Sequence, residues 1–457
     1  MRRYETLAIG NPDGLCFGVA TEPLTCGFGL RIGAGRVYPE LNFTLPTMLI
    51  EEATWTSVRQ HYEEIGAMIH RAAARLQLDG LMVEFELLPP MTERAAWGGE
   101  ITRILHEALK SAHNALGLPC ALRVTPTDIR DKRRPPLLRS GEEWDMLVAS
   151  FEECAREGAD VLSIESVGGK EVHDEALMYG DVAGILFALG SLAPRDMEFL
   201  WRMVVDLCAA QNVIPGGDSA CGFANTAMQL ASQGMLPEVL AAVVRAASAV
   251  RSLVAYEMGA RGPSKDCAYE GPVLKAITGT TISMEGKSAT CAHFSPVGNI
   301  AAAACDLWSN ESVQNVRLLS GNAPEAYLEL LAYDCRLFNT AVASRTEKVL
   351  RSLLVASDVG RSPQALILSP ESSIRVARAI VGAADHYHGT LAAARCAVDI
   401  IAEAHAARRT ELNAREEQWL NRIRQELDGL PDKEETLLGR MVDAYGHLFT
   451  PSSYGLT

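Results

Sequence analysis

The stretch VIPGGDSACGFANTAMQLA (213–231) leads from an apolar run, through a turn of small residues, into a helical pattern. Two glycines and Asp218 end the apolar run, and Cys221 stands in the turn before the helical residues begin. A strand followed by such a turn and a helix is the repeating unit of α/β proteins. Because barrel enzymes of this class keep their chemistry in these turns, Cys221 is a candidate functional residue.

The same alternation of a short β-branched run with a longer amphipathic stretch recurs along residues 1–321. Short connections between such units indicate parallel strands, and eight units predict a closed (β/α)8 TIM barrel. A doubly wound sheet is the alternative, but the count of eight favours the barrel. The eight expected strands are 29–35, 80–87, 120–126, 159–166, 212–218, 252–258, 280–286 and 315–321.

Residues 322–457 carry helical patterns almost throughout and show no further strand signal. We therefore expect a helical C-terminal region that follows the barrel domain of residues 1–321. Such a region packs on the barrel or forms a subunit interface.

Charge and hydropathy limit the kinds of partner and the cellular compartment that we expect for this protein. The formal net charge is −15, and the one basic cluster is RDKRRPP (130–136), which argues against a nucleic-acid groove. The most apolar helical stretch, 239–257, is interrupted by Arg245 and Arg251, and the N-terminus lacks the apolar segment of a signal peptide. We expect a cytoplasmic protein that binds neither nucleic acid nor a membrane.

Eleven cysteines are present, and no two of them form a C-x-x-C pair. Zinc-ribbon and thioredoxin-like sites therefore lack their usual motif. In a reducing cytoplasm most of these cysteines should be small buried apolar residues.

Three residues follow consecutive expected strands and should share one rim of the barrel: Glu165, Cys221 and Cys267. Two thiolates and a carboxylate suit zinc, and three protein ligands leave the fourth position that catalytic zinc requires. A cysteine in such a loop is nevertheless more often packed than metal-bound, and the separations match no short metal-binding motif. From the residues alone, both interpretations stay open.

Other polar residues could support chemistry at this rim. Asn42, Glu84 and Asp218 are candidates for an outer layer of hydrogen-bonding groups. His173 is close to Glu165 in the sequence and could reach the pocket, but we expect it to cap or solvate its loop. The glycine-containing segment 31–42 is too incomplete for a nucleotide-binding fingerprint, and we expect it to form the first strand and a loop at the barrel mouth.

Four segments together resemble the zinc-containing subunit of methanol:corrinoid methyltransferases, and the resemblance extends over nearly the whole chain. They are GVATEPLTCGFGLRIGAGRVYPELNF, SIESVGGKEVHDEAL, GGDSACGFANTAM and GPSKDCAYEGPVLKAITG. That family has a TIM barrel whose catalytic zinc is held by one glutamate and two cysteines. The resemblance assigns these roles to Glu165 of SIES, Cys221 of DSACGFANTA and Cys267 of KDCAYEGP.

The resemblance also implies a reaction and partners. The expected activity is zinc-dependent transfer of a methyl group from methanol to the Co(I) corrinoid of a partner corrinoid protein, forming methyl-Co(III). A homodimer within a larger complex with that corrinoid protein is implied as well. Two alternatives remain: the same chemistry with another small methyl donor, and a non-catalytic subunit that binds the corrinoid protein around a structural metal.

Overall fold

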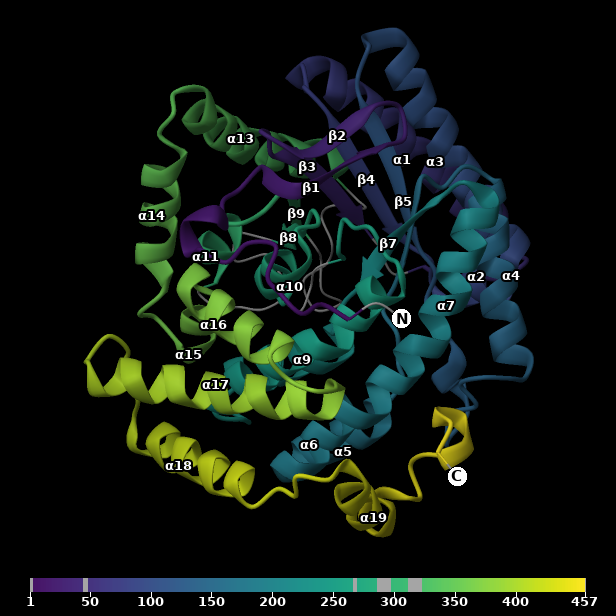
Figure 1. Cartoon of the computed structure of the whole chain (residues 1–457). Helices are drawn as coiled ribbons and strands as arrows, with labels where there is room; N and C mark the ends of the chain where they lie inside the picture. Colours follow the sequence, from purple (N-terminus) through teal and green to yellow (C-terminus); the bar gives the residue numbers. More distant parts are fainter. Residues whose placement is uncertain (1–2, 44–47, 266–268, 286–296, 311–322, 457) are drawn as a thin grey trace.

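A curled parallel sheet of seven strands forms the centre of the α/β fold (Figure 1). The computed structural model describes residues 3–43, 48–265, 269–285, 297–310 and 323–456. The strand order is β7-β6-β5-β4-β3-β9-β8, and each neighbouring pair is parallel. The strands are β3 (Tyr38–Phe43), β4 (Leu81–Glu86), β5 (Cys120–Thr125), β6 (Val161–Ile164), β7 (Ile214–Asp218), β8 (Ser283–Glu285) and β9 (Leu307–Asn310).

A short segment, 261–264, lies between the two edge strands of this sheet. The backbone N–H of Gly262 donates to Gly216 O of β7 at 2.7 Å, and the N–H of Ser264 donates to Thr281 O, just before β8, at 3.2 Å. Ser264 also forms an isolated parallel bridge with Ile282. The described sheet is thus a curled sheet of seven parallel strands, and this segment, which is not a regular strand, contacts both of its edges. The closed (β/α)8 barrel stays a prediction from the sequence.

Two of the eight expected strands are wrong as barrel strands. Residues 252–258 belong to the long helix α9 (Glu238–Met258). Residues 29–35 do contain a strand, β2 (Leu30–Ala34), but it pairs antiparallel with β1 (Val19–Cys26) in a separate two-stranded sheet. The expected strand 315–321 lies outside the described residues.

The β1–β2 sheet covers the amino-terminal ends of the strands of the curled sheet. Leu30 and Ile32 are fully buried in an apolar cluster with side chains from the first residues of the barrel strands. Those side chains are Met82, Ala121, Val161 and Leu307. The expectation that segment 31–42 faces the barrel mouth is therefore wrong for its first part, which lies at the opposite end.

Helices surround the sheet because their apolar faces pack on its outer side chains. In α1, for example, Val58, Tyr62, Ile65 and Ile69 are buried at helical spacing. Helices up to the last barrel strand are α1 (Trp55–Leu76), α2 (Pro89–Glu93), α3 (Ala95–Leu116), α4 (Glu142–Arg156), α5 (Lys170–Tyr179), α6 (Val182–Phe187), α7 (Ala193–Gln211), α8 (Thr226–Ser232), α9, α10 (Gly271–Thr278) and α11 (Gly298–Ala302). Single turns are η1 (Pro12–Gly14), η2 (Arg130–Lys132), η3 (Ala188–Leu192) and η4 (Cys221–Asn225).

Helix α9 is buried along almost its whole length by neighbouring helices. Every residue from Val239 to Glu257 is buried, and α7, α15 and α17 pack against it. Its length and composition would suffice to cross a membrane, but the apolar window lies entirely inside the protein.

Among the described residues after 322, helices are the only elements of regular secondary structure, and the green-to-yellow helices occupy the left and lower sides of the view in Figure 1. They are α13 (Pro324–Ala343), α14 (Glu347–Asp358), α15 (Pro363–Leu368), α16 (Pro370–Val381), α17 (His386–Ala406), α18 (Ala414–Asp428), α19 (Glu434–Tyr445) and the final turn η5 (Pro451–Tyr454).

Helix α13 packs on the barrel as an outer helix, although the expected division at 321/322 places it in the C-terminal region. It contacts β3, β9 and α1. Ion pairs join it to α1, from Arg71 to Glu325 at 3.1 Å and from Arg75 to Glu329 at 3.0 Å. The main hydrophobic core also includes side chains from both regions. The two-part division stays a prediction from the sequence.

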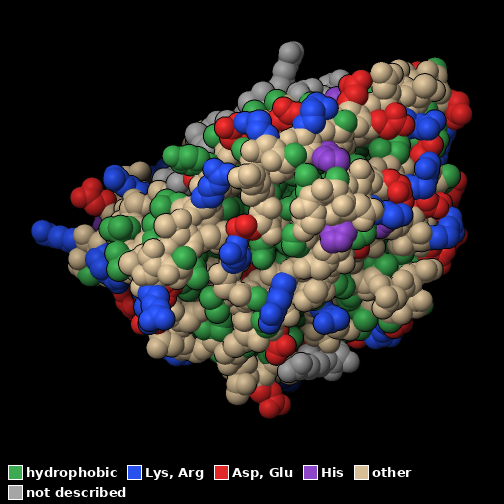
Figure 2. Space-filling model, turned by 90° about the horizontal axis from the view of Figure 1, so that it is seen from above, with side chains coloured by type: hydrophobic (Ala, Val, Ile, Leu, Met, Phe, Trp, Pro, Cys, Tyr) green, Lys and Arg blue, Asp and Glu red, His purple; other side chains and the backbone are tan. Residues whose placement is uncertain are grey.

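Charges of both signs are interspersed on the face of the molecule seen from above, among apolar and neutral polar side chains (Figure 2). The whole chain has a formal net charge of −15, of which this view shows one face. On this face, no part of the described surface gathers positive side chains into a continuous stripe.

Candidate metal centre

Buried charged side chains from three neighbouring strands of the curled sheet contact one another. Glu40 of β3, Glu84 of β4 and Arg123 of β5 are all buried, and Arg123 forms an ion pair with each carboxylate, at 3.1 Å from Glu84. Burial raises the pKa of Glu40 despite the attraction of Arg123. Burial opposes ionisation of Glu84 too, but Arg123 and Lys265 together hold its pKa below the ordinary value. The carboxylate of Glu84 is therefore charged.

Lys265 connects this buried layer to the carboxyl-terminal rim. Its Nζ lies 3.0 Å from Glu84 Oε1 and 3.5 Å from Glu165 Oε1, and it also pairs with Glu86. The Lys265 side chain is almost fully buried, whereas that of Glu165 is 29% exposed. One ammonium group thus faces three carboxylates, of which Glu165 is the most exposed.

Glu165 and Cys221 leave neighbouring parallel strands. Glu165 directly follows β6, and Cys221 comes three residues after β7, as the first residue of the π-helical turn η4. The strands β6 and β7 pair with each other, so both side chains lie at the same rim. Asn225 Nδ2 lies 3.5 Å from Cys221 Sγ.

Cys221 differs from most of the other described cysteines in its exposure. It and Cys396 are half-buried, whereas the remaining described cysteines are buried. Burial raises the pKa of Cys26, Cys120 and Cys208 to about 12, so these thiols stay protonated. The expectation that most cysteines are packing residues is confirmed for the described part of the chain.

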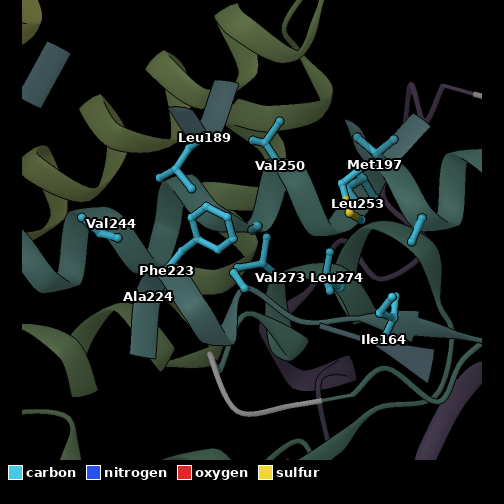
Figure 3. Packing of buried hydrophobic residues seen from close by; sticks show 14 of the residues in the cluster. Ile164, Leu189, Met197, Phe223, Ala224, Val244, Val250, Leu253, Val273 and Leu274 are labelled. Atoms are coloured by element: carbon cyan, nitrogen blue, oxygen red, sulfur yellow. The ribbon is translucent and has the colours of Figure 1, made fainter. Parts of the chain in front are cut away.

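Phe223 anchors the turn that carries Cys221. Its ring lies among apolar side chains of α9 and α10, including Val250 and Val273 (Figure 3). The Arg251 guanidinium stands 4.9 Å from the centre of that ring. The turn is therefore fastened to the core two residues after the cysteine.

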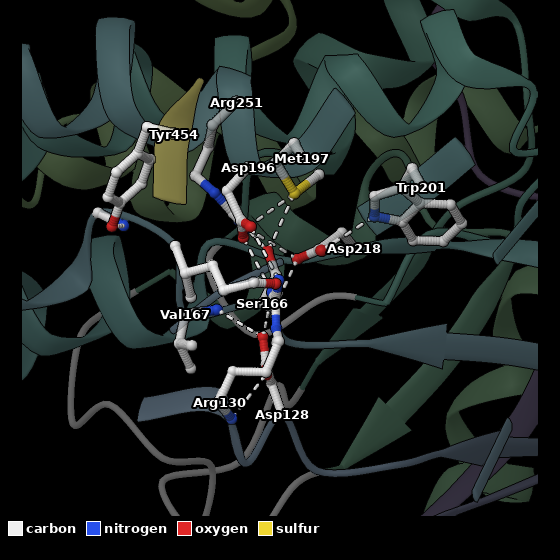
Figure 4. Close-up of polar contacts among 12 residues, drawn as sticks. Asp128, Arg130, Ser166, Val167, Asp196, Met197, Trp201, Asp218, Arg251 and Tyr454 are labelled. Carbon is white, nitrogen blue, oxygen red and sulfur yellow. Dashed lines mark hydrogen bonds and ion pairs between the residues drawn. The ribbon is translucent and has the colours of Figure 1, made fainter. Parts of the chain in front are cut away.

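The loop that carries Glu165 is held from several elements (Figure 4). Ser166 N donates to Asp218 Oδ1 at 3.3 Å, and Val167 N donates to Asp128 Oδ2 at 3.0 Å. Gly169 N donates to the hydroxyl of Tyr454 at 2.9 Å. Backbone groups on this loop thus find partners after β5, at the end of β7 and at the C-terminus.

Asp128 is itself fixed by a buried ion cluster. Arg130 lies between Asp128 and Asp196, at 2.7 Å and 2.8 Å. Burial raises the pKa of Asp196, against the attraction of Arg130. A side chain at Gly168 would collide with Asp196, so this close approach requires a glycine in the loop.

The three expected metal ligands are only partly placed. Glu165 and Cys221 come together at one rim, whereas Cys267 lies outside the described residues. Within the described ranges, no group of three His, Cys, Asp or Glu side chains is arranged to hold a metal. A half-buried thiol and a part-exposed carboxylate that follow two neighbouring strands nevertheless suit two of the three positions of a zinc site.

The expected outer polar residues are buried, and they differ in their partners. Asp218 accepts hydrogen bonds from Ser166 N and, at 3.1 Å, from Trp201 Nε1, so it supports the loops. Asn42 is buried, and its Oδ1 has no hydrogen-bond partner among the described residues. The expectation for His173 is wrong, because its ring is fully buried against Phe223, with centroids 5.0 Å apart.

Four residues that contact the segments of Glu165 and Cys221 were not expected from the sequence: Lys265, Arg251, Glu270 and Tyr454. The position of Lys265, two residues before Cys267, could have indicated it. Arg251 could have been noticed as a charged residue inside an otherwise apolar helix. Glu270 and Tyr454 meet their partners only through the folded arrangement.

Comparisons with known proteins agree over the whole chain. The family model of the methanol-cobalamin methyltransferase B subunit (MtaB) matches residues 1–455. The methanol–corrinoid protein co-methyltransferase of Methanosarcina barkeri is 37% identical over 462 residues, which cover 99% of each protein. The crystal structure of the methanol:cobalamin methyltransferase complex MtaBC from the same species matches with a TM-score of 0.93 at 36% identity, covering all of both chains. The chain therefore belongs to the methanol-cobalamin methyltransferase B subunit family, a family of methyltransferases.

Proposed function

We propose that this protein transfers the methyl group of methanol to the Co(I) corrinoid of a partner corrinoid protein, with a zinc ion held by Glu165, Cys221 and Cys267. The C–O bond of methanol breaks, a carbon–cobalt bond of methyl-Co(III) forms, and the hydroxyl group leaves as water after taking up a proton. The observation that carries the proposal is the full-length match to the family, at 37% identity to a methanol–corrinoid protein co-methyltransferase. The position of Glu165 and Cys221 at the ends of adjacent strands supports it.

The donor set fits zinc better than it fits a hard cation. Thiolates favour zinc over magnesium or calcium, and three protein ligands leave one position for a substrate. When bound, zinc supplies a Lewis acid that polarises the C–O bond of the alcohol. Cys267 belongs to the set through the resemblance and through its place two residues after Lys265.

The protein's own residues tune the charge at this rim. Two thiolates and one carboxylate outweigh the charge of a divalent cation by one unit. Lys265, at 3.5 Å from Glu165, offsets that excess of negative charge and also compensates Glu84 and Glu86. Buried ion pairs of Glu40, Glu84 and Arg123 fill the interior below the rim. Methanol and the corrinoid would therefore meet at the rim itself.

The corrinoid protein is proposed as partner because the chain matches the solved complex MtaBC over its full length. We further propose a homodimer within that complex and a cytoplasmic location. The family resemblance supports the first, and the acidic composition is compatible with the second.

The test is methyl transfer by zinc-loaded protein, under anaerobic conditions, from methanol to Co(I) corrinoid that is free or bound to the partner. Loss of the Co(I) spectrum and appearance of the methyl-Co(III) spectrum should require methanol. Cys221→Ala should abolish the change while the protein stays folded. Transfer from another methyl donor but not from methanol would overturn the substrate assignment, and loss of the fold on ligand replacement would indicate a structural metal.

A further inference from the structure

We propose that Arg251 and Ser252, neighbours on helix α9, are positioning residues that join the three zinc-ligand segments into one unit. The inference rests on the proposed function, because it takes Glu165, Cys221 and Cys267 as the ligands. It adds residues that belong to no ligand segment and that hold these segments in register.

Arg251 joins the first two segments. Its Nη2 donates to the hydroxyl of Ser166, the residue after Glu165, and at 3.0 Å to Asp218 Oδ1, at the end of β7 (Figure 4). Its guanidinium also faces the ring of Phe223, on the far side of Cys221 in the sequence. One side chain therefore contacts the Glu165 loop and both flanks of Cys221.

Ser252 extends the connection to the third segment. Its hydroxyl donates to Glu270 Oε1 at 2.7 Å, and Glu270 stands three residues after Cys267. The same Glu270 oxygen accepts a hydrogen bond from Ala220 N at 2.8 Å, directly before Cys221. Arg251 Nη1 in turn lies 3.3 Å from the Ser252 hydroxyl, so the two branches meet.

The residues that make these contacts are buried, so the contacts should hold the attached loops rigidly. The side chains of Arg251 and Asp218 have no exposed surface, and Ser252 and Glu270 are buried as well. Buried charged hydrogen bonds are strong and geometrically restrictive, and α9 is packed on all sides. The loop of Glu165 and the turn of Cys221 should consequently be ordered before the metal arrives, which reduces the entropic cost of binding it.

The experiment measures the zinc dissociation constant, by competition with a chromophoric chelator, and the visible spectrum of the Co²⁺-substituted protein. Removal of outer groups that orient metal ligands typically weakens metal binding about 10–100-fold. Arg251→Met and Ser252→Ala should therefore weaken zinc binding by about tenfold or more and shift the thiolate-to-cobalt bands. Arg251→Lys, which keeps the charge, should lie between the parent and Arg251→Met.

The matched control is Lys275→Met. Lys275 forms an equally buried ion pair with Asp306 at 2.9 Å, but at the amino-terminal ends of β8 and β9. It should lose thermal stability while keeping the parental zinc affinity and cobalt spectrum. Equal loss of zinc affinity in Lys275→Met and Arg251→Met would overturn the inference, because the effect would then be general destabilisation.

The outcomes also separate this inference from the proposed function. If zinc binding by the parent protein does not depend on Cys221, the proposed function fails. If it does depend on Cys221 but both Arg251→Met and Ser252→Ala bind zinc like the parent, only the inference fails. Should Arg251→Met not fold, Ser252→Ala decides the question, because it removes a single hydroxyl.

Discussion

Gly169 N donates a hydrogen bond of 2.9 Å to the hydroxyl of Tyr454, which lies 285 residues further along the chain. Gly169 belongs to the loop that begins with Glu165, and Tyr454 is in the last turn of the described chain. Burial raises the pKa of Tyr454, so the hydroxyl stays neutral. The C-terminus thus supports the loop that carries a proposed metal ligand.

Tyr454→Phe should destabilise the protein and weaken zinc binding. The change leaves the buried N–H of Gly169 without a partner, which costs about 1–3 kcal/mol in the free energy of unfolding. Denaturant unfolding and chelator competition measure the two effects. Tyr387→Phe is the control, because Tyr387 donates to Pro431 O at 2.6 Å, away from the Glu165 loop, and it should change stability only. Parental zinc affinity in Tyr454→Phe would show that this contact does not position the loop.

His173 should make the protein less stable as the pH falls. Its ring is fully buried, and this burial lowers its pKa below the ordinary 6.5. Below about pH 6.5 the unfolded chain binds a proton at this position while the folded protein does not, so folding stability falls by up to about 1.4 kcal/mol per pH unit until the folded pKa is reached. Well above pH 6.5, His173 is neutral in both the folded and the unfolded chain, so it has no effect on how stability depends on pH.

The comparison of parent and His173→Phe over this pH range tests the effect. Phenylalanine keeps an aromatic ring against Phe223 and cannot titrate. The stability of the variant should depend less on pH between about pH 7 and pH 5. Identical slopes for the two proteins would mean that His173 binds its proton equally in both states.

The sequence predicts the apolar barrel strands better than the polar ones. Strands β4 and β5 are rich in buried aliphatic side chains, and their expected positions are confirmed. Strand β3 was missed because its sequence, YPELNF, contains Pro39 and Asn42, residue types that are depleted in strands.

Helix α9 shows the opposite failure. Residues 252–258 look like a strand because Val254 and Tyr256 alternate with other residues, and the helix has little amphipathic pattern since it is buried on all sides. At the site, the rule that functional residues follow parallel strands selects Glu165 and Cys221 as candidates, and their metal-binding role stays a prediction. The contacts of Arg251 with Ser166 and Asp218 join residues far apart in the sequence and depend on the folded barrel.

Lys265→Met should cost about 3–5 kcal/mol of stability, because it removes a buried cation that pairs with both Glu84 and Glu86. Glu84 retains Arg123 as an ionic partner, whereas Glu86 loses the one ion pair that the described residues provide for it. The double variant Lys265→Met/Glu86→Gln should therefore recover part of the loss. A double-mutant cycle by denaturant unfolding measures this coupling, and strictly additive effects would contradict the ion pair as the cause.

Shortening a buried apolar side chain should affect zinc affinity at the carboxyl-terminal ends of the strands but not at their amino-terminal ends. Ile32 is fully buried in the cluster that closes the amino-terminal end, so Ile32→Ala should cost about 2–5 kcal/mol without changing zinc affinity. Phe223 anchors the turn of Cys221, so Phe223→Leu should weaken zinc binding even though it removes less buried volume than a change to alanine. Unfolding and chelator competition on both variants give the comparison. If Ile32→Ala lowers zinc affinity as much as Phe223→Leu while both proteins are folded, the metal centre depends on the whole barrel and not on its rim.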